Sequence, residues 1–276
     1  MSNRKHGVFL SGALTATCLA AAPANAQSLD DKFWVEVSAY WATVDSSVRL
    51  EPQNATRPGT VIDFESDLDL DNRKALPALL AGVRLGDRWS IAAEYYSLNR
   101  SATRGISREL VFDDVTFPAS ASVSSKFDSD IYRLTVGYAF YRTDDAEIGG
   151  AIGLHATDFE ISLTGEAQAG GSQVQSVTRR RAALAPLPTL GLFGSIRVAP
   201  QVTLSARADY LSLSVDKYDG RLLNAQAAAT YRILDNVGVG LAYRYVDYRV
   251  DVDKDNWEGR VKYKFRGPAL FLQAGF

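Results

Sequence analysis

The sequence predicts an all-β fold: a transmembrane, antiparallel, up-and-down β-barrel of about ten strands, with eight strands as the alternative. Three observations predict it. Apolar and polar residues alternate along ten segments, no later stretch is apolar enough for a membrane-spanning helix, and aromatic residues recur near the ends of the apolar stripes. Of the 276 residues, 46% are hydrophobic and 22% are charged, which excludes both a helical membrane bundle and a disordered polyelectrolyte.

Residues 1–26 are expected to form a cleaved secretory signal peptide, so the barrel domain is expected over residues 27–276. Arg4 and Lys5 form a basic start, residues 7–22 are small or apolar, and residues 24–26 read Ala-Asn-Ala, an A-x-A cleavage pattern. A membrane anchor is the alternative, which the shortness and the Ala and Thr content of the run disfavour.

Removal of this leader limits the chemistry of the mature chain. The single Cys18 and the single Met1 would both be lost, which excludes disulfides, iron–sulfur clusters, zinc fingers and thiol catalysis. Of 30 basic residues 28 would remain against 32 acidic ones, a net charge near −4 that does not suit a nucleic-acid partner. An exported chain without cysteine fits a bacterial envelope.

Ten segments alternate with a period of two residues. In residues 202–210, Val, Leu, Ala, Ala and Tyr occupy one face and Thr, Ser, Arg and Asp the other, as in a strand with one apolar side. The ten segments are residues 32–45, 73–86, 88–112, 123–142, 146–164, 183–198, 202–217, 220–234, 237–252 and 257–276. Tight turns are expected at 86–88, 142–145, 199–201 and 234–236. Long links are expected at 46–72, 113–122 and 165–182, with shorter ones near 218–220 and 253–256.

A soluble β-sandwich would alternate as well, but three features favour a membrane barrel. The even strand number places both chain ends on the side of the tight turns. The chain ends at Phe276, which shares a face with Ala274, Leu272 and Leu270. Aromatic rings recur on the apolar stripe near strand ends, as in the girdles of membrane barrels: Trp41, Trp89, Tyr138, Phe140, Tyr210, Tyr231 and Tyr243.

The ending Leu270-Phe-Leu-Gln-Ala-Gly-Phe276 looks like the terminal strand of bacterial outer-membrane proteins. Residues 30–276 resemble the small single-chain barrels of the OmpA-like and OmpW-like kind, and residues 59–71 are similar to an element near the start of an uncharacterised group of them. The resemblance implies the outer membrane of a Gram-negative bacterium, with outer-membrane lipid and lipopolysaccharide as surroundings. It also implies Phe276 as membrane-insertion signal, read by the barrel-assembly machinery through the C-terminal strand.

The alternation assigns many charged side chains to the interior. Because charges removed from water must be paired, we expect a salt-bridge network that fills a narrow lumen, and an arginine-lined conduit favouring anions is the alternative. The inward glycines, among them Gly82, Gly137 and Gly149, either make room for stretched arginines or leave a wet cavity. The expected network consists of Glu36, Arg84, Glu94, Arg133, Glu147, His155, Arg197, Arg207, Asp209, Arg232 and Arg244.

No catalytic residue, cofactor or metal site is predicted. His155 and Thr157 have the spacing of the His and Ser in lipid-hydrolysing outer-membrane enzymes, but the phase of the strand points His155 into the lumen. The Asp-Asp and Asp-His pairs of the omptin proteases are not reproduced by Asp113-Asp114 and Asp144-Asp145. Acids at every second position from Asp63 to Asp71 would share one face of an extended segment, which could gather Ca²⁺ but suits a solvated face better.

Five arginines are expected to protrude on the side of the long links, where they could contact the phosphates of lipopolysaccharide. They are Arg104, Arg108, Arg179, Arg180 and Arg181. Taken together, the sequence favours a non-enzymatic barrel with a structural, adhesive or envelope-maintenance role. A narrow anion-favouring diffusion channel and a barrel hydrolase acting on lipid or peptide are the alternatives.

Overall fold

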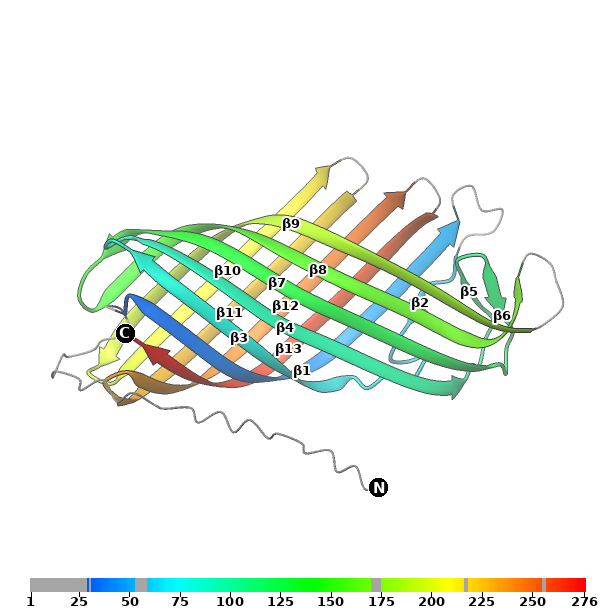
Figure 1. The fold of residues 1–276 in the computed structure, drawn as a ribbon, viewed down its shortest axis with the longest axis horizontal. Helices are drawn as coiled ribbons and strands as arrows, with labels where there is room; N and C mark the ends of the chain where they lie inside the picture. The colour runs from blue at the N-terminus through cyan, green and yellow to red at the C-terminus, as the bar shows by residue number, and fades with distance from the viewer. Residues whose placement is uncertain (1–28, 30, 53–58, 170–174, 216–217, 255–256) are drawn as a thin grey trace, which may run out of the picture.

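The chain forms a closed barrel in the computed structural model (Figure 1). The structure describes residues 29, 31–52, 59–169, 175–215, 218–254 and 257–276. The leader expected over residues 1–26 lies outside them. Within the described part of the chain, no helix has the length and apolar character needed to cross a membrane.

Ten long antiparallel strands form the wall, which confirms the predicted strand number. Each pairs with its neighbours in chain order, and β1 closes the ring by pairing with β13 from Trp34↔Gly275 to Pro52↔Trp257. The wall strands are β1 (Phe33–Pro52), β3 (Arg73–Leu85), β4 (Trp89–Gly105), β7 (Ser122–Arg142), β8 (Ala146–Ala169), β9 (Gln175–Ala199), β10 (Val202–Val215), β11 (Tyr218–Leu234), β12 (Val237–Lys254) and β13 (Trp257–Gly275). Three short strands complete the described part: β2 (Ile62–Asp63), β5 (Leu110–Phe112) and β6 (Val115–Phe117).

The expected tight turns lie at one end of the barrel together with the carboxyl end of the chain, at the left of Figure 1. In outer-membrane barrels the short turns are periplasmic and the longer loops extracellular, which orients the molecule. Several expected links are in fact strand. Residues 46–52 extend β1, and residues 165–169 and 175–182 extend β8 and β9, while residues 170–174 are outside the described part. Conversely, the segment 88–112 is not one strand, because β4 ends at Gly105.

The periplasmic side of the barrel, which we call the membrane half, is apolar outside. On β7 the outward residues from Tyr132 to Phe140 are apolar, and nine residues of a tilted strand match the bilayer core. The predicted girdle residues all point outward, and each is at least 39% exposed: Trp41, Trp89, Tyr138, Phe140, Tyr210, Tyr231 and Tyr243.

Beyond this belt the polarity is reversed, and we call this part the extracellular half. On β8, outward Ile152 and Leu154 give way to Asp158 and Glu160, while the inward face changes from His155 to buried Phe159. The expectation of a polar interior along every strand is therefore wrong for this half. Its interior is a dry core whose largest members include Phe127, Tyr248, Tyr263 and Phe265.

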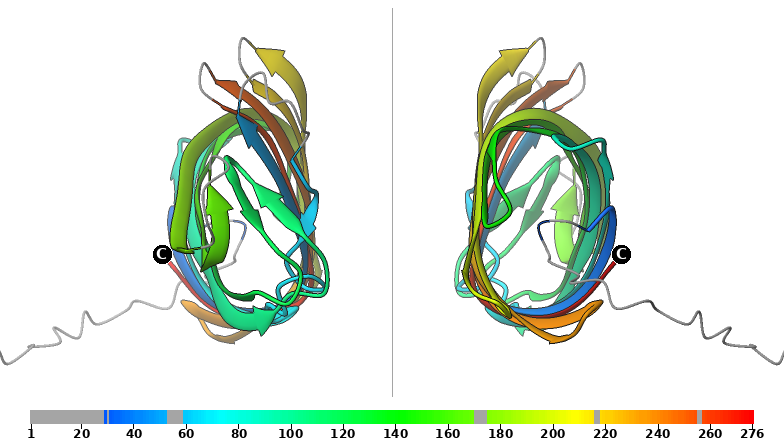
Figure 2. Two further views of the ribbon diagram at one scale, coloured as in Figure 1. Left: turned by 90° about the vertical axis from the view of Figure 1, so that its right-hand side faces the viewer. Right: turned by 90° about the vertical axis from the view of Figure 1, so that its left-hand side faces the viewer.

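Two segments, together called the lid, complete the extracellular half: residues 59–72, and the β5–β6 hairpin with its turn, residues 110–117. Because β3 is short, β1 has a free edge beyond Thr43, and β2 pairs with it at Ser47 and Val48. The hairpin pairs with β8 and lies within the ring in the views along the barrel (Figure 2). Its apolar side chains and those of residues 62–70 are buried in the core: Ile62, Phe64, Leu68, Leu70, Leu110, Phe112, Val115 and Phe117.

Candidate functional site

The centre of the membrane half is an ionic network, as the alternation predicts. Arg133 binds Glu94, and its other nitrogen lies 2.7 Å from an oxygen of Asp209. Arg244 lies 2.5 Å from the second oxygen of Glu94, and Arg207 donates 2.9 Å bonds to Asp209. All five side chains are inside the barrel and come from four strands, β4, β7, β10 and β12.

Aromatic rings enclose the network on its extracellular side. The guanidinium of Arg244 lies 5.5 Å from the ring centre of Tyr40 and 5.2 Å from that of Tyr96. Such cation–π contacts are strongest where water is excluded, and both tyrosines are 1% exposed. The network is therefore covered by ring faces before the dry core begins.

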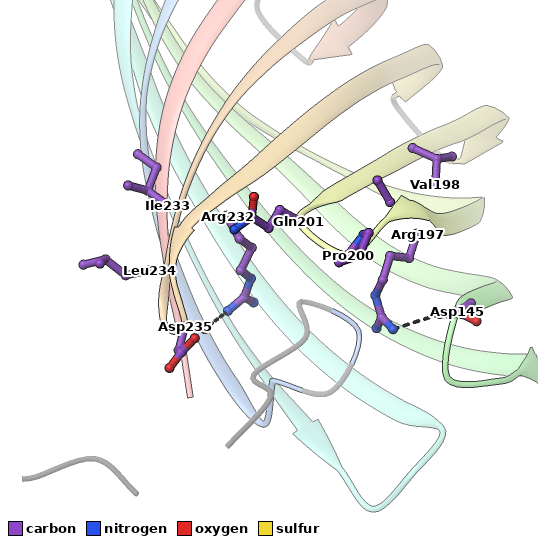
Figure 3. Close-up of a pocket in the computed structure, with 10 residues that line it drawn as sticks. Asp145, Arg197, Val198, Pro200, Gln201, Arg232, Ile233, Leu234 and Asp235 are labelled. Atoms are coloured by element: carbon purple, nitrogen blue, oxygen red, sulfur yellow. Dashed lines mark hydrogen bonds and ion pairs between the residues drawn. The ribbon is translucent and has the colours of Figure 1, made fainter. Parts of the chain in front are cut away.

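A second group of ion pairs lies nearer the periplasm (Figure 3). Arg197 lies 2.9 Å from Asp145, and Arg232 binds Asp31 and the backbone carbonyl of Asp235. The two arginines line an open groove of about 570 Å³ at the rim. Arg84 pairs with Glu147 at 3.1 Å. Alternation within the strands does not predict the roles of Asp31 and Asp145, because one precedes the first strand and the other lies in a turn.

The interior is not filled completely. A cavity of about 220 Å³ lies on the periplasmic side of the network, bordered by Arg84, Arg207 and several hydroxyl groups. That volume is below the usual size of ligand pockets, about 300–1,000 Å³. The inward glycines have a third role, besides making room for stretched arginines or leaving a wet cavity. A Cβ at Gly82 would overlap the ring of Trp34, and one at Gly149 would overlap Phe193, so aromatic rings occupy the space.

Two members of the expected network take no part in it. Glu36 is half-buried, and no ion pair to it is found within the described residues. His155 lies between the network and the dry core, 1% exposed, with its ring centre 6.0 Å from that of Tyr248. Neither of its ring nitrogens has a hydrogen-bond partner in the described part of the chain.

The geometry at His155 does not suit nucleophilic catalysis. A catalytic hydroxyl needs a base within about 2.6–3.2 Å. The hydroxyl of Thr157 is buried and shares a 3.2 Å hydrogen bond with Tyr263 instead. The phase of the strand predicts that His155 points into the lumen, and the structure shows this orientation.

The five arginines expected to protrude are bound to the protein's own acids. Arg108 binds Asp67, and Arg104 donates a 3.0 Å bond to the carbonyl of Ser66 and lies 3.7 Å from Asp69. The contacts of Arg104 and of buried Arg100, which binds Glu65, attach residues 59–72 to β4, and Arg108 attaches them to the link after β4. The acidic segment is not extended, because the Asp67 amide donates to the Asp63 carbonyl in a turn.

The remaining three arginines lie on β9 and not in a link. Arg179 holds Asp114 through bonds of 2.6 and 2.9 Å, and Arg181 binds Asp113, so both attach the hairpin turn to the wall. Arg180 points outward and lies 2.5 Å from Glu160. The hydrogen bonds from Arg179 hold the pKa of the Asp114 carboxyl below its ordinary value.

A closed ring with an apolar belt, aromatic girdles and a charged interior defines an integral outer-membrane β-barrel protein. A family model agrees. Residues 11–265 match the outer membrane protein beta-barrel domain, so the chain belongs to that family and resides in the bacterial outer membrane.

Three solved structures match the chain at low sequence identity, and the first of them shares its fold. The outer membrane protease OmpT from Escherichia coli is 12% identical, with a TM-score of 0.55, over 90% of this chain and 98% of that one. The toluene transporter TodX of Pseudomonas putida is 10% identical with a TM-score of 0.38, covering 90% of each chain. The attachment invasion locus protein Ail of Yersinia pestis is 11% identical with a TM-score of 0.32, covering 87% of this chain and 99% of that one. No curated protein matches the chain.

Proposed function

We propose that this protein is a sealed, non-enzymatic barrel with a structural or adhesive role in maintaining the outer membrane. The observation that carries the proposal is the dry core of the extracellular half. Phe64 of the lid contacts Phe127 of the wall at 5.1 Å between ring centres, and both are at most 1% exposed. Ions and polar solutes would have to enter an apolar interior packed like that of a soluble protein.

The ionic network is a second barrier to conduction. Glu94 and Asp209 bind three arginines between them, so each of these charges has a partner of opposite sign and the arginines do not line a free path. An anion channel would need arginines whose charge faces water in the lumen. This arrangement supports a structural role over a diffusion channel, and buried His155 supports it over a hydrolase.

Conductance in planar bilayers tests the proposal with variants that open one barrier at a time. The wild type should be silent. A variant with both lid segments replaced by Gly-Ser linkers should also be silent, because the ionic network still closes the membrane half. Conductance should appear only when Glu94, Arg133, Asp209 and Arg244 are changed to serine as well. Regular conductance steps from the wild type would overturn the proposal, and hydrolytic activity lost in His155→Ala would overturn its non-enzymatic part.

A further inference from the structure

The outward face just above the apolar belt differs from one side of the barrel to the other. On β3, β1 and β13 the first polar row contains Arg73, Thr43 and Arg266, which the strand register places side by side. The next two outward positions on β13 are Lys264 and Lys262, and all four cations are exposed. We call Arg73, Arg266, Lys264 and Lys262 the basic row.

The corresponding position on the other side of the barrel is acidic. There the first polar row pairs Asp130 of β7 with Asp158 of β8, one step above Tyr132 and Ala156. The nearest outward cations, Lys126 and Arg180, are bound to Asp128 and Glu160. Positive charge at the upper edge of the belt is therefore concentrated on one side.

Most arginines at this end of the barrel are neutralised by the protein, but the basic row is largely not. Among the described residues, no carboxylate forms an ion pair with Arg73, Arg266 or Lys262, and Lys264 has only an exposed contact of 3.4 Å with Asp247. Strands are about 4.8 Å apart, so Arg73 and Arg266, on either side of β1, are separated by about 10 Å. Two forked donors at that spacing suit a headgroup that carries more than one phosphate.

The apolar surface on the membrane side of the basic row suits the apolar part of such a molecule. One step toward the membrane on β1 and β12 are the exposed rings of Trp41 and Tyr243, and below them lie Val37 and Leu241. Amphipathic rings mark the headgroup level, so the row lies where phosphates of outer-leaflet lipid are found. A free phosphate ion would gain no binding energy from this apolar surface.

We propose that the basic row is a binding site for a phosphorylated glycolipid of the outer leaflet, with Arg73 and Arg266 as the principal phosphate ligands. The site differs from Arg104, Arg108 and the arginines of β9, whose guanidiniums hold the lid or pair with the wall. The proposal is independent of whether the barrel conducts.

Native mass spectrometry of the refolded full chain in detergent, titrated with lipid A, tests the proposal. R73S/R266S should weaken lipid A binding by about tenfold or more, since two charge-assisted contacts are lost. R73K/R266K should retain most of the binding. The matched control is K126S/R180S, which removes two cations from the acidic side and should bind as the wild type does. Heat-modifiable gel mobility confirms that each variant is folded.

Two arms with the wild type alone keep the test decisive if a variant fails to fold. Lipid A freed of its phosphates should bind about as weakly as intact lipid A binds R73S/R266S. Excess inorganic phosphate should not displace intact lipid A, because it cannot use the apolar surface. Equal binding with and without lipid phosphates, displacement by inorganic phosphate, or equal loss in R73S/R266S and K126S/R180S would overturn the assignment.

Discussion

The two halves of the barrel have opposite polarities, both on the outer face of the wall and in the interior of the ten-stranded ring. The membrane half is apolar outside and contains paired charges, such as those of Glu94, Arg133 and Arg244. The extracellular half is charged outside and contains a dry core around Phe127 and Phe265. The same strands run through both halves. The medium around each segment, lipid or water, therefore determines which face of the strand is apolar.

The largest expected effect is in the membrane half, where removal of one charge leaves another buried alone. Glu94→Gln leaves Arg244 without its partner, and breaking a buried pair costs about 3–5 kcal/mol. The double variant with Arg244→Met should recover much of that loss, because the unpaired charge is then removed too. Urea unfolding in lipid vesicles measures both. A double variant less stable than Glu94→Gln would contradict this account of the interior.

Truncating a phenylalanine should matter more in the extracellular half than in the membrane half. Phe265→Ala opens a cavity in a packed core and should cost about 3–5 kcal/mol. Phe140→Ala, on the lipid-facing surface, loses only the transfer of the ring and should cost about 1.5–3 kcal/mol, since lipid fills the space. The same unfolding experiment compares them, and equal losses would mean that the extracellular core is not dry.

A new outward charge should distinguish the halves on a single strand. Leu190 of β9 is 70% exposed on the lipid-facing surface, and Leu190→Arg should cost about 2–4 kcal/mol near the bilayer midplane. Thr178→Arg, on the outward face of the same strand beyond the belt, should change stability by no more than about 0.5 kcal/mol. If the two variants were equally destabilised, the belt would extend further than the structure places it.

The smallest expected effect is the response of the lid to acid. The pKa of Asp114 is lowered by its hydrogen bonds from Arg179, so the ionised carboxyl favours the folded state. This contribution is complete above the unfolded pKa of about 3.9 and is lost as pH falls through the folded value. The protection that the β5 and β6 amides gain from Asp114, measured as the difference between the wild type and Asp114→Asn, should therefore be constant from neutral pH down to about 4 and decrease below it. A difference that does not change with pH would contradict the role of this carboxylate.

Much of the membrane half could be predicted from the sequence, because lipid outside and charge inside give one constant alternation. The ten strands, the outward girdles and the inward side chains of Glu94, Arg133 and Asp209 all follow from it. For the extracellular half the constant alternation predicts the wrong polarity of the interior, although the sequence contains a signal of the change. On β13 the apolar positions are even from Leu272 to Pro268 and odd from Phe265 to Val261, and this change of phase marks the edge of the belt.

The contacts of the lid could not have been predicted from alternation. Arg179 and Asp114 are 65 residues apart, and Arg108 and Asp67 are 41 residues apart. Which acid each arginine meets depends on the relative height of strands and loops, and alternation carries no information on that height. Alternation therefore does not distinguish an arginine that faces lipid phosphate from one that binds a carboxylate of the protein, as Arg108 and Arg179 do.

The shortness of β3 has a mechanical consequence. The ladder of backbone hydrogen bonds between β4 and β7 is continuous from Trp89 to Gly105, whereas the one between β9 and β10 ends at Leu190 and Tyr210. Between β1 and β4, beyond Thr43, a backbone ladder is replaced by β2 and by the links that Arg100 and Arg104 of β4 make with Glu65 and Ser66. A lateral pull on the barrel would therefore concentrate at two places, beyond Thr43 of β1 and beyond Leu190 of β9, where the backbone ladder between wall strands is interrupted.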